Sequence, residues 1–283
     1  MKVGIVGLGL IGGSLGLDLR SLGFEVLGIS RREKTCSRAL DKKIVDEASV
    51  SLSLLRKADL VFVCTPLTAI AATVERLIPY LNPDAIITDV GSVKMPIIDP
   101  CSRLWANFVG GHPMAGTAEQ GIAAAQKQLF SGAAYVLTPN PRTSVTALQR
   151  VQEIAQSLGA KTYICSPEIH DKAVAWISHL PLMVSAGLIS SCVAEAEPEV
   201  LELARKLASS GFRDTSRVGG GNPELGLMIA RYNRQALLRS LYQYRHSLNS
   251  IIEDIEQEDW GHLEEFLTST KQERPLFINN PPP

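Results

Sequence analysis

The sequence predicts an α/β protein in two parts: a doubly wound, mainly parallel sheet in residues 1–165 and an all-helical domain in residues 166–283. Two observations lead to this prediction. Short apolar segments alternate with amphipathic helical segments up to about residue 165, and long helical periodicity replaces this alternation after Ser166. Alternating strands and helices are typical of a parallel sheet with crossover helices.

Seven segments have the length and composition of buried strands, because they are apolar or β-branched and turn residues follow them. They are Lys2–Val6, Glu25–Ile29, Leu60–Cys64, Ala85–Asp89, Asn107–Gly110, Ala134–Leu137 and Lys161–Cys165. The crossover after Ile29 is expected to begin a helix within SRREKTCSRAL.

The first turn, in VGIVGLGLIGGSLG, has three glycines in G-x-G-x-x-G spacing, with Leu10 and Ile11 between the last two. Gly7 suits the tight turn, Gly9 lets a pyrophosphate approach, and Gly12 lets the helix pack on the strand. A helix N-terminus there would present free N–H groups to the phosphates. The motif predicts a Rossmann-type dinucleotide site; the alternative is that the glycines only pack a helix on a strand.

The end of the second predicted strand indicates which dinucleotide binds. An NAD site usually has an acidic residue there, which accepts a hydrogen bond from the ribose. This chain has Ser30, Arg31 and Arg32 instead, with Thr35 one helical turn later. A hydroxyl and a guanidinium suit a 2′-phosphate, so NADP is predicted over NAD. The alternative is that Arg31 and Arg32 form a solvated surface pair.

Two further loops are expected at the same edge of the sheet. The first is expected near the adenine-side ribose and phosphates, although Pro66 also suits a plain helix start; its residues are Cys64, Thr65 and Pro66. The second follows Asp89 in DVGSVK, where Gly91 turns the chain before Ser92. Ser92 is either a helix cap or a hydroxyl directed at the nicotinamide end of the site.

His112 lies in GGHPMAG, after the next predicted strand, on a loop that glycines leave bare of side chains. A dehydrogenase that oxidises an alcohol needs a base for the hydroxyl proton while hydride leaves the carbon. Imidazole suits this role near neutral pH. His112 is therefore the candidate base, although a lone histidine is more often structural.

In the second part, SPEIHDKAVAWISHLPLMVSAGLISSCVAEA reads as one long helix, with Ser166 as its cap and a kink at Pro181. His179, just before the kink, either satisfies a freed carbonyl or serves as a substrate ligand. A second helix is expected over Glu199–Ser209, ended by Gly211.

Residues from Pro223 to about Glu258 read as one long helix with a heptad-like apolar seam. The seam consists of Leu237, Leu241, Tyr244, Leu248, Ile251 and Ile255. It packs either within its own domain or against another subunit. The end of the chain, NNPPP, is expected to be frayed.

The polar, glycine-rich join at residues 209–226 contains Arg213, Asp214 and Arg217. Arginine binds carboxylates through two hydrogen bonds, so this join is a candidate anion site. The alternative is an Arg–Asp pair that holds the loop.

Composition excludes several classes of function. A net charge of -1 provides no field for nucleic acid or an anionic membrane. The five cysteines show no CxxC or Cys/His spacing, so neither a metal site nor a disulfide framework is expected, and their scatter favours a reducing cytoplasm. No membrane span or leader segment is expected.

Taken together, GLGLIGGSLG, DVGSVK, GGHPMAGT, AWISHLP and GFRDTSRVGGGNPELG resemble the prephenate/arogenate dehydrogenase family of tyrosine biosynthesis, in order and over nearly the whole chain. The likeness is greatest to short, NADP-using arogenate dehydrogenases. The resemblance implies a Rossmann domain followed by a helical dimerisation domain, and hence a homodimer. It also implies oxidation of arogenate, with loss of its ring carboxylate as carbon dioxide, to tyrosine.

The resemblance also assigns roles to residues. It makes His112 the base on the ring hydroxyl, Ser92 a hydrogen-bonding partner there, and Arg217 the ligand of the side-chain carboxylate. His179, Arg213, Gly116 and Thr117 are expected at the substrate. Some relatives have a glutamate where this chain has Ala118, with the acid one residue later at Glu119.

Three alternatives remain open. Prephenate dehydrogenases carry out the same steps on a keto acid, and the difference depends on which acid meets the amine of arogenate: Asp214, Glu119 or Glu224. A β-hydroxyacid dehydrogenase would rely on a helical-domain lysine such as Lys172, but the surrounding glycine pattern is missing. A non-catalytic NADP sensor would need neither His112 nor Arg217.

Overall fold

The computed structural model describes residues 1–117 and 119–278. The described residues form two compact units, Met1–His170 and 171–278. The sequence boundary was placed five residues earlier, between 165 and 166. Helix α6 (Pro167–Val174) contains the division, so the change in sequence character precedes the division between the units by one helical turn.

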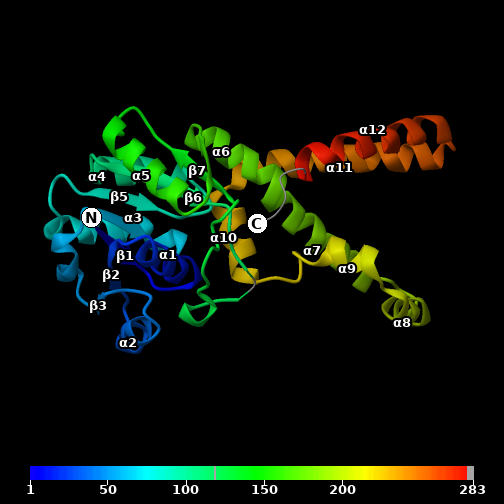
Figure 1. Cartoon of the computed structure of the whole chain (residues 1–283). Helices are drawn as coiled ribbons and strands as arrows, with labels where there is room; N and C mark the ends of the chain where they lie inside the picture. The colour runs from blue at the N-terminus through cyan, green and yellow to red at the C-terminus, as the bar shows by residue number, and fades with distance from the viewer. Residues whose placement is uncertain (118, 279–283) are drawn as a thin grey trace. The chain divides into compact units, whose positions relative to one another are not determined.

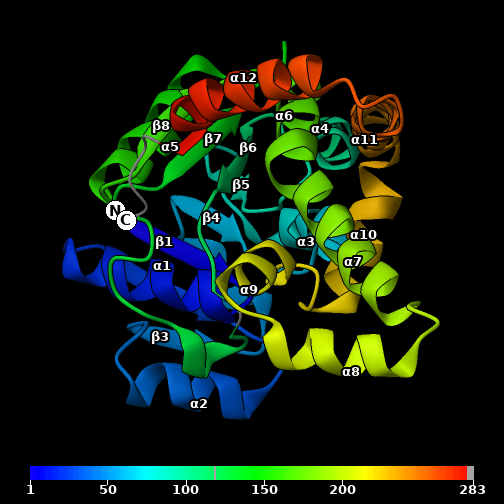
Figure 2. The same cartoon turned by 90° about the vertical axis from the view of Figure 1, so that its right-hand side faces the viewer.

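The first unit is built on an eight-stranded sheet of order β3-β2-β1-β4-β5-β6-β7-β8. Its strands are β1 (Lys2–Val6), β2 (Glu25–Ile29), β3 (Glu47–Ser49), β4 (Leu60–Val63), β5 (Ile86–Asp89), β6 (Phe108–Pro113), β7 (Ala134–Thr138) and β8 (Lys161–Ile164). Every pair is parallel except β6 with β7. Figure 2 shows β1, β4, β5 and β6 side by side in this order. The doubly wound, mainly parallel prediction is thus confirmed.

Two strands differ from the prediction. Strand β3 was missed because it has three residues and only one apolar side chain. Strand β6 extends to Pro113, whereas the sequence placed its end at Gly110. Antiparallel pairing with β7, which sets His112 opposite Val136, draws the glycine-rich segment into the sheet. The expectation that His112 stands on a loop is therefore wrong.

Helices α1 (Leu10–Ser21), α2 (Glu33–Asp41), α3 (Ile70–Leu77), α4 (Met95–Leu104) and α5 (Val145–Ser157) complete this unit. Side chains alternate between the faces of the sheet. Val3 and Ile5 of β1 join one buried cluster with Leu15 of α1 and Val151 of α5. Helices α3 and α4 pack against each other, with α3 against β4 and α4 against β6. This core holds the carboxyl ends of the strands in register.

The second unit is entirely helical in its described residues. It continues α6 and contains α7 (Leu180–Val193), α8 (Pro198–Leu207), α9 (Ser210–Ser216), α10 (Pro223–Tyr232), α11 (Arg234–Glu256) and α12 (Trp260–Ile278). Figure 1 shows α11 and α12, in orange and red, as neighbouring helices. Helix α12 was not predicted from the sequence, whereas the frayed end NNPPP lies outside the described residues.

The long helix expected after Ser166 forms, and Ser166 Oγ accepts a hydrogen bond from Ile169 N at 3.2 Å. Its irregularity lies at Ala175–His179, a π-helical segment directly before the turn that contains Pro181. Proline lacks an N–H and crowds the carbonyl four residues earlier, and a wider turn accommodates both.

Two helix boundaries of the second unit were wrongly predicted. Gly211 does not end the second helix; α8 ends at Leu207, and Gly211 lies inside α9, within the segment expected to be an irregular join. The helix from Pro223 to about Glu258 is interrupted at Asn233, whose φ of −117° and ψ of 34° are not helical. The side chain of Asn233 explains the break, as described below.

Much apolar surface of the second unit is exposed within the single chain. By length and composition alone, Pro167–Val193 would pass as a membrane-spanning helix, and only 28% of its most apolar window is buried. This is weak support for a membrane span, because a helix that a second subunit covers has the same composition. In the predicted heptad seam, Leu237 is buried, but Tyr244, Leu248 and Ile255 are exposed.

Candidate active site

The glycine turn after β1 has the geometry that a dinucleotide requires. Gly7 has a φ of +104°, and its N–H donates to Ile29 O at 2.9 Å. A Cβ on Gly12 would lie 2.0 Å from Gly7 O, whereas one on Gly9 would meet nothing within 4 Å. Gly9 precedes α1 without a side-chain cap. The turn is therefore tight and open, and the first N–H groups of α1, from Leu10 and Ile11, can bind phosphate.

The end of β2 lies beside this turn, through the same Gly7–Ile29 hydrogen bond. Ser30 Oγ accepts from Arg32 N at 3.3 Å, which shapes the start of α2. The side chains of Arg31 and Arg32 are exposed, and Thr35 is half-buried. A hydroxyl and two guanidinium groups thus occupy the place where an acid would meet the ribose of NAD.

The loop after β4 lies against the glycine turn. Cys64 N donates to Val6 O at 2.7 Å, and a Cβ on Gly7 would lie 2.5 Å from Cys64 O. Burial, with a smaller effect of Asp89, raises the pKa of the Cys64 thiol, so this thiol stays protonated at neutral pH. The half-buried Thr65 follows, and Pro66 precedes a single 3₁₀ turn at Leu67–Ala69.

A buried ion pair connects the loop after β5 to strand β6. Lys94 and Asp89 have fully buried side chains in contact, and Lys94 Nζ also donates to Gly111 O at 2.6 Å. Asp89 accepts from Gly91 N at 2.8 Å and from Gly111 N at 3.2 Å. This pair therefore fixes the loop that carries Ser92 against the strand that carries His112. Ser92 is not a helix cap, because α4 has Lys94 at that position.

His112 is 8% exposed and lies on β6 beyond Asp89, at the carboxyl edge of the parallel strands. Its Nδ1 lies 2.8 Å from Nε2 of His170, and the rings meet edge to face at 71°. His170, on α6, is 2% exposed. The imidazole is therefore held by another imidazole, which the sequence analysis did not identify.

The segment after β6 is more open. Gly116 and Thr117 are exposed, and a Cβ on Gly116 would meet nothing within 4 Å. Thr117 Oγ1 accepts from Glu119 N at 3.2 Å. Ala118 lies outside the described residues. A side chain or ligand at Gly116 would therefore meet no neighbouring atom, and Glu119 is exposed as well.

In the second unit, His179 is 1% exposed and Asn233 holds it. The Asn233 amide nitrogen lies 3.0 Å from His179 Nδ1 and donates to the carbonyl of Asp171 at 2.7 Å. These two bonds explain the break between α10 and α11, because Asn233 leaves the helix where its amide meets both partners. His179 Nδ1 accepts, so its proton is on Nε2 in the neutral ring.

The arginine-containing join makes two side-chain contacts of different kinds. Arg213 Nε lies 3.2 Å from Asp214 Oδ1, but these residues are neighbours within α9 and their side chains are 74% and 70% exposed. Arg217 is exposed directly after α9. Two residues later, Gly219 N donates to Ser185 Oγ at 2.8 Å, and a Cβ on Gly219 would lie 2.3 Å from Ala186 N. Close packing on α7 therefore fixes the backbone two residues after Arg217.

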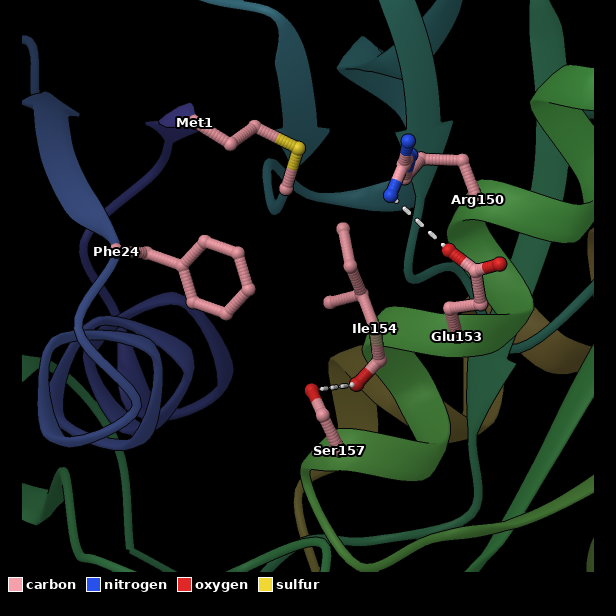
Figure 3. A pocket seen from close by; sticks show the side chains of 6 residues that line it. All are labelled: Met1, Phe24, Arg150, Glu153, Ile154 and Ser157. Carbon is pink, nitrogen blue, oxygen red and sulfur yellow. Dashed lines mark hydrogen bonds and ion pairs between the residues drawn. The ribbon is translucent and has the colours of Figure 1, made fainter.

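A separate pocket of about 250 Å³ lies in the first unit (Figure 3). Phe24 and Ile154 face each other across it, and the Arg150–Glu153 pair lies at its rim. Met1 and Phe24 precede β1 and β2, so this pocket is at the amino ends of the strands. It is at the opposite edge from the glycine turn, and ligands of such sheets bind at the carboxyl ends.

Sequence reasoning missed His170 and Asn233. Neither belongs to a spaced motif: His170 lies in a polar stretch of a helix, and Asn233 reads as an interior helical residue. An asparagine inside an apolar helical pattern was the available signal, because asparagine competes for backbone hydrogen bonds and favours helix ends. Among the described residues, no cluster of three or more His, Cys, Asp or Glu side chains suits a metal ion.

Fold and site together define a nucleotide-binding oxidoreductase with a Rossmann-type unit and a helical unit. The nucleotide-binding domain of prephenate dehydrogenase matches residues 15–164, and the dimerization domain of prephenate dehydrogenase matches residues 166–269. The chain belongs to the prephenate dehydrogenase family.

Individual relatives agree with this assignment. Prephenate dehydrogenase of Bacillus subtilis is 31% identical over 277 residues, which are 95% of this chain and 74% of that protein. The crystal structure of Synechocystis arogenate dehydrogenase is 52% identical, with a TM-score of 0.92, over 98% of this chain and 100% of that one. Prephenate dehydrogenase from A. aeolicus, in complex with hydroxyphenyl propionate and NAD+, is 30% identical, with a TM-score of 0.91, over 98% of each chain.

Proposed function

We propose that this enzyme oxidises L-arogenate to L-tyrosine with NADP, releasing carbon dioxide. The observation that carries the proposal is the placement of His112 at the carboxyl edge of the sheet, tied by Asp89 and Lys94 to the Ser92 loop. The 52% identity to an arogenate dehydrogenase favours the amino acid over the keto acid prephenate. Prephenate remains the second candidate, because it is the substrate named for the Bacillus relative.

The reaction needs placement, a base and a hydrogen bond at the substrate oxygen. His112 Nε2 accepts the proton of the ring hydroxyl while hydride leaves the carbon that bears this hydroxyl. Ser92 hydrogen-bonds the hydroxyl oxygen. Bound NADP supplies the hydride acceptor. The dienone then takes up the electron pair of the bond to the ring carboxylate, carbon dioxide leaves, and the phenolate oxygen takes a proton back. Aromatisation makes the sequence effectively irreversible.

The other site residues bind either the cofactor or the substrate. Ser30, Arg31 and Arg32 bind the 2′-phosphate of NADP, with Thr35 beside them, because a phosphate is bound best by charge-assisted hydrogen bonds. In the helical unit, Arg217 binds the side-chain carboxylate of arogenate, and His179, fixed by Asn233, is a further substrate ligand. Arg213 is the weaker candidate for binding this carboxylate, because Asp214 already pairs with it.

We further propose that the enzyme is a homodimer through its helical unit. The matched dimerization domain covers residues 166–269, and exposed apolar side chains of this unit need a cover. They include Trp176, Ile177, Leu203, Tyr244, Leu248, Ile252 and Ile255. A second copy would bury them, and each Å² of apolar surface removed from water would stabilise the dimer by about 25 cal/mol.

The test measures nicotinamide reduction with arogenate and with prephenate, each with NADP and NAD, for the parent enzyme and for His112→Asn. We expect the arogenate–NADP pair to have the highest kcat/KM. We expect the substitution to lower kcat by about 10²- to 10⁴-fold, as for loss of a general base, with NADP binding retained. Higher kcat/KM with prephenate would favour the second candidate, and NADP binding without any turnover would identify a sensor.

A further inference from the structure

The base His112 does not stand alone, because its Nδ1 is 2.8 Å from Nε2 of His170. Both side chains are more than nine-tenths buried. The backbone of His170 belongs to the first turn of α6, where its backbone N–H donates to Ser166 O at 3.0 Å. The contact therefore joins two fixed elements, strand β6 and helix α6, and sets the orientation of the catalytic ring.

A hydrogen bond between two neutral imidazoles has one donor and one acceptor, and the choice fixes the tautomer of each ring. If His112 Nδ1–H donates, its Nε2 carries a lone pair and can accept the hydroxyl proton. If His170 donates instead, His112 presents Nε2–H and cannot act as the base. Once His112 has accepted the proton, both its nitrogens carry hydrogen, and His170 can only accept.

We propose that His170 is a positioning residue whose Nε2 accepts from His112 Nδ1–H throughout the reaction. It keeps the basic nitrogen of His112 directed at the substrate and stabilises the imidazolium that forms there. In the step itself, the substrate O–H bond breaks and the His112 Nε2–H bond forms, while His170 neither gains nor loses a proton. The inference rests on the proposed role of His112 as the base.

Two substitutions in the full-length enzyme test this role. His170→Gln offers an amide oxygen close to the position of Nε2, whereas His170→Leu offers no acceptor. We expect His170→Leu to lower kcat about 10- to 100-fold, as for loss of a residue that orients a functional histidine. KM for arogenate and the affinity for NADP should change little, and His170→Gln should restore most of kcat. His246→Gln, at an exposed histidine of α11, is the matched control.

A second measurement needs no substitution of His170. In ¹⁵N-histidine-labelled parent enzyme, the signal of His112, identified by its loss in His112→Asn, should be that of the Nδ1–H tautomer. An Nε2–H tautomer in the parent, or parental kcat in His170→Leu, would overturn the positioning role. If His112→Asn were active, the proposed base would be wrong; if only His170→Leu were normal, the base would stand and His170 would have no catalytic effect.

Discussion

Lys94 is a cation without access to solvent, and Asp89 is the anion that makes its burial tolerable. A buried pair adds little net stability over apolar residues, but loss of one partner costs about 3–5 kcal/mol. What the pair provides is geometry: Asp89 binds the N–H groups of Gly91 and Gly111, and Lys94 binds the Gly111 carbonyl. The spacing between the Ser92 loop and His112 is therefore set by two charges whose side chains are fully buried.

Cofactor choice also depends on single side chains. Arg31→Ala removes a cation proposed to bind the 2′-phosphate, which NAD lacks. We expect KM for NADP to rise on the order of 10- to 100-fold, since a hydrogen bond to a charged group contributes about 1.5–3 kcal/mol. KM for NAD should stay within a few-fold, and steady-state kinetics with both cofactors gives the ratio.

Arg38→Ala, at an exposed arginine in the last turn of α2, the helix that begins two residues after Arg31, removes the same charge away from the glycine turn. It should leave the NADP/NAD ratio unchanged. If Arg31→Ala also left this ratio unchanged, the solvated-pair interpretation of Arg31 would be correct.

Among the elements, the helices of the second unit show how side chains override periodicity. An uninterrupted apolar pattern predicted one helix from Pro223, yet the Asn233 side chain binds Asp171 O and His179 Nδ1, and the helix breaks there. The break separates α10 from the long α11 and keeps His179 in place. Helix periodicity identifies the buried face, but it does not show where a polar side chain competes for the backbone.

The hairpin of α11 and α12 contains a titrating contact. His262 Nδ1 lies 2.7 Å from Asp254 Oδ1, and this hydrogen bond, with the charge of Asp254, raises the pKa of His262. A histidine with a raised folded-state pKa stabilises the fold below its unfolded pKa, and this contribution is lost as pH rises through the folded value. We therefore expect the contact to stabilise the hairpin in acid and to be lost in alkali.

To measure this, the free energy of unfolding by urea is compared for the parent and His262→Gln from about pH 5.5 to about pH 9, a range that brackets histidine titration. The parent should be more stable at the acid end, and the difference should vanish toward the alkaline end. His246→Gln, on α11, is the control that removes an exposed imidazole away from Asp254 and His262. A difference that stayed constant across the range, or grew with pH, would contradict the assignment.

At the level of the whole molecule, the exposed half of the α11 seam predicts assembly. Leu248→Glu places a carboxylate on the surface proposed to meet a second copy. Loss of a buried leucine costs about 1.5–3 kcal/mol, so the dimer dissociation constant should rise about tenfold or more. Sedimentation equilibrium over a range of protein concentrations measures this constant.

Asn249→Glu changes the neighbouring exposed residue of α11 and adds the same charge. It should leave the dissociation constant close to that of the parent. Equal dissociation by both variants, or by neither, would argue against the seam as the interface.

The sequence by itself determined the features that local patterns encode. Strand length, glycine spacing and the missing acid after β2 are properties of neighbouring residues, and they predicted the parallel sheet, the tight Gly7 turn and the nucleotide edge. The family resemblance came from five such local motifs, and matches to both domains of the family confirm it.

Only the tertiary structure decided how the functional side chains are held. His112 meets His170 across 58 residues of sequence, His179 meets Asn233 across 54, and Asp89 meets Gly111 across 22. Such contacts leave no periodic trace, because each depends on where two distant elements pack. For the same reason, His112 proved to lie in a strand: its pairing with β7 is a long-range choice that the glycines around it do not reveal.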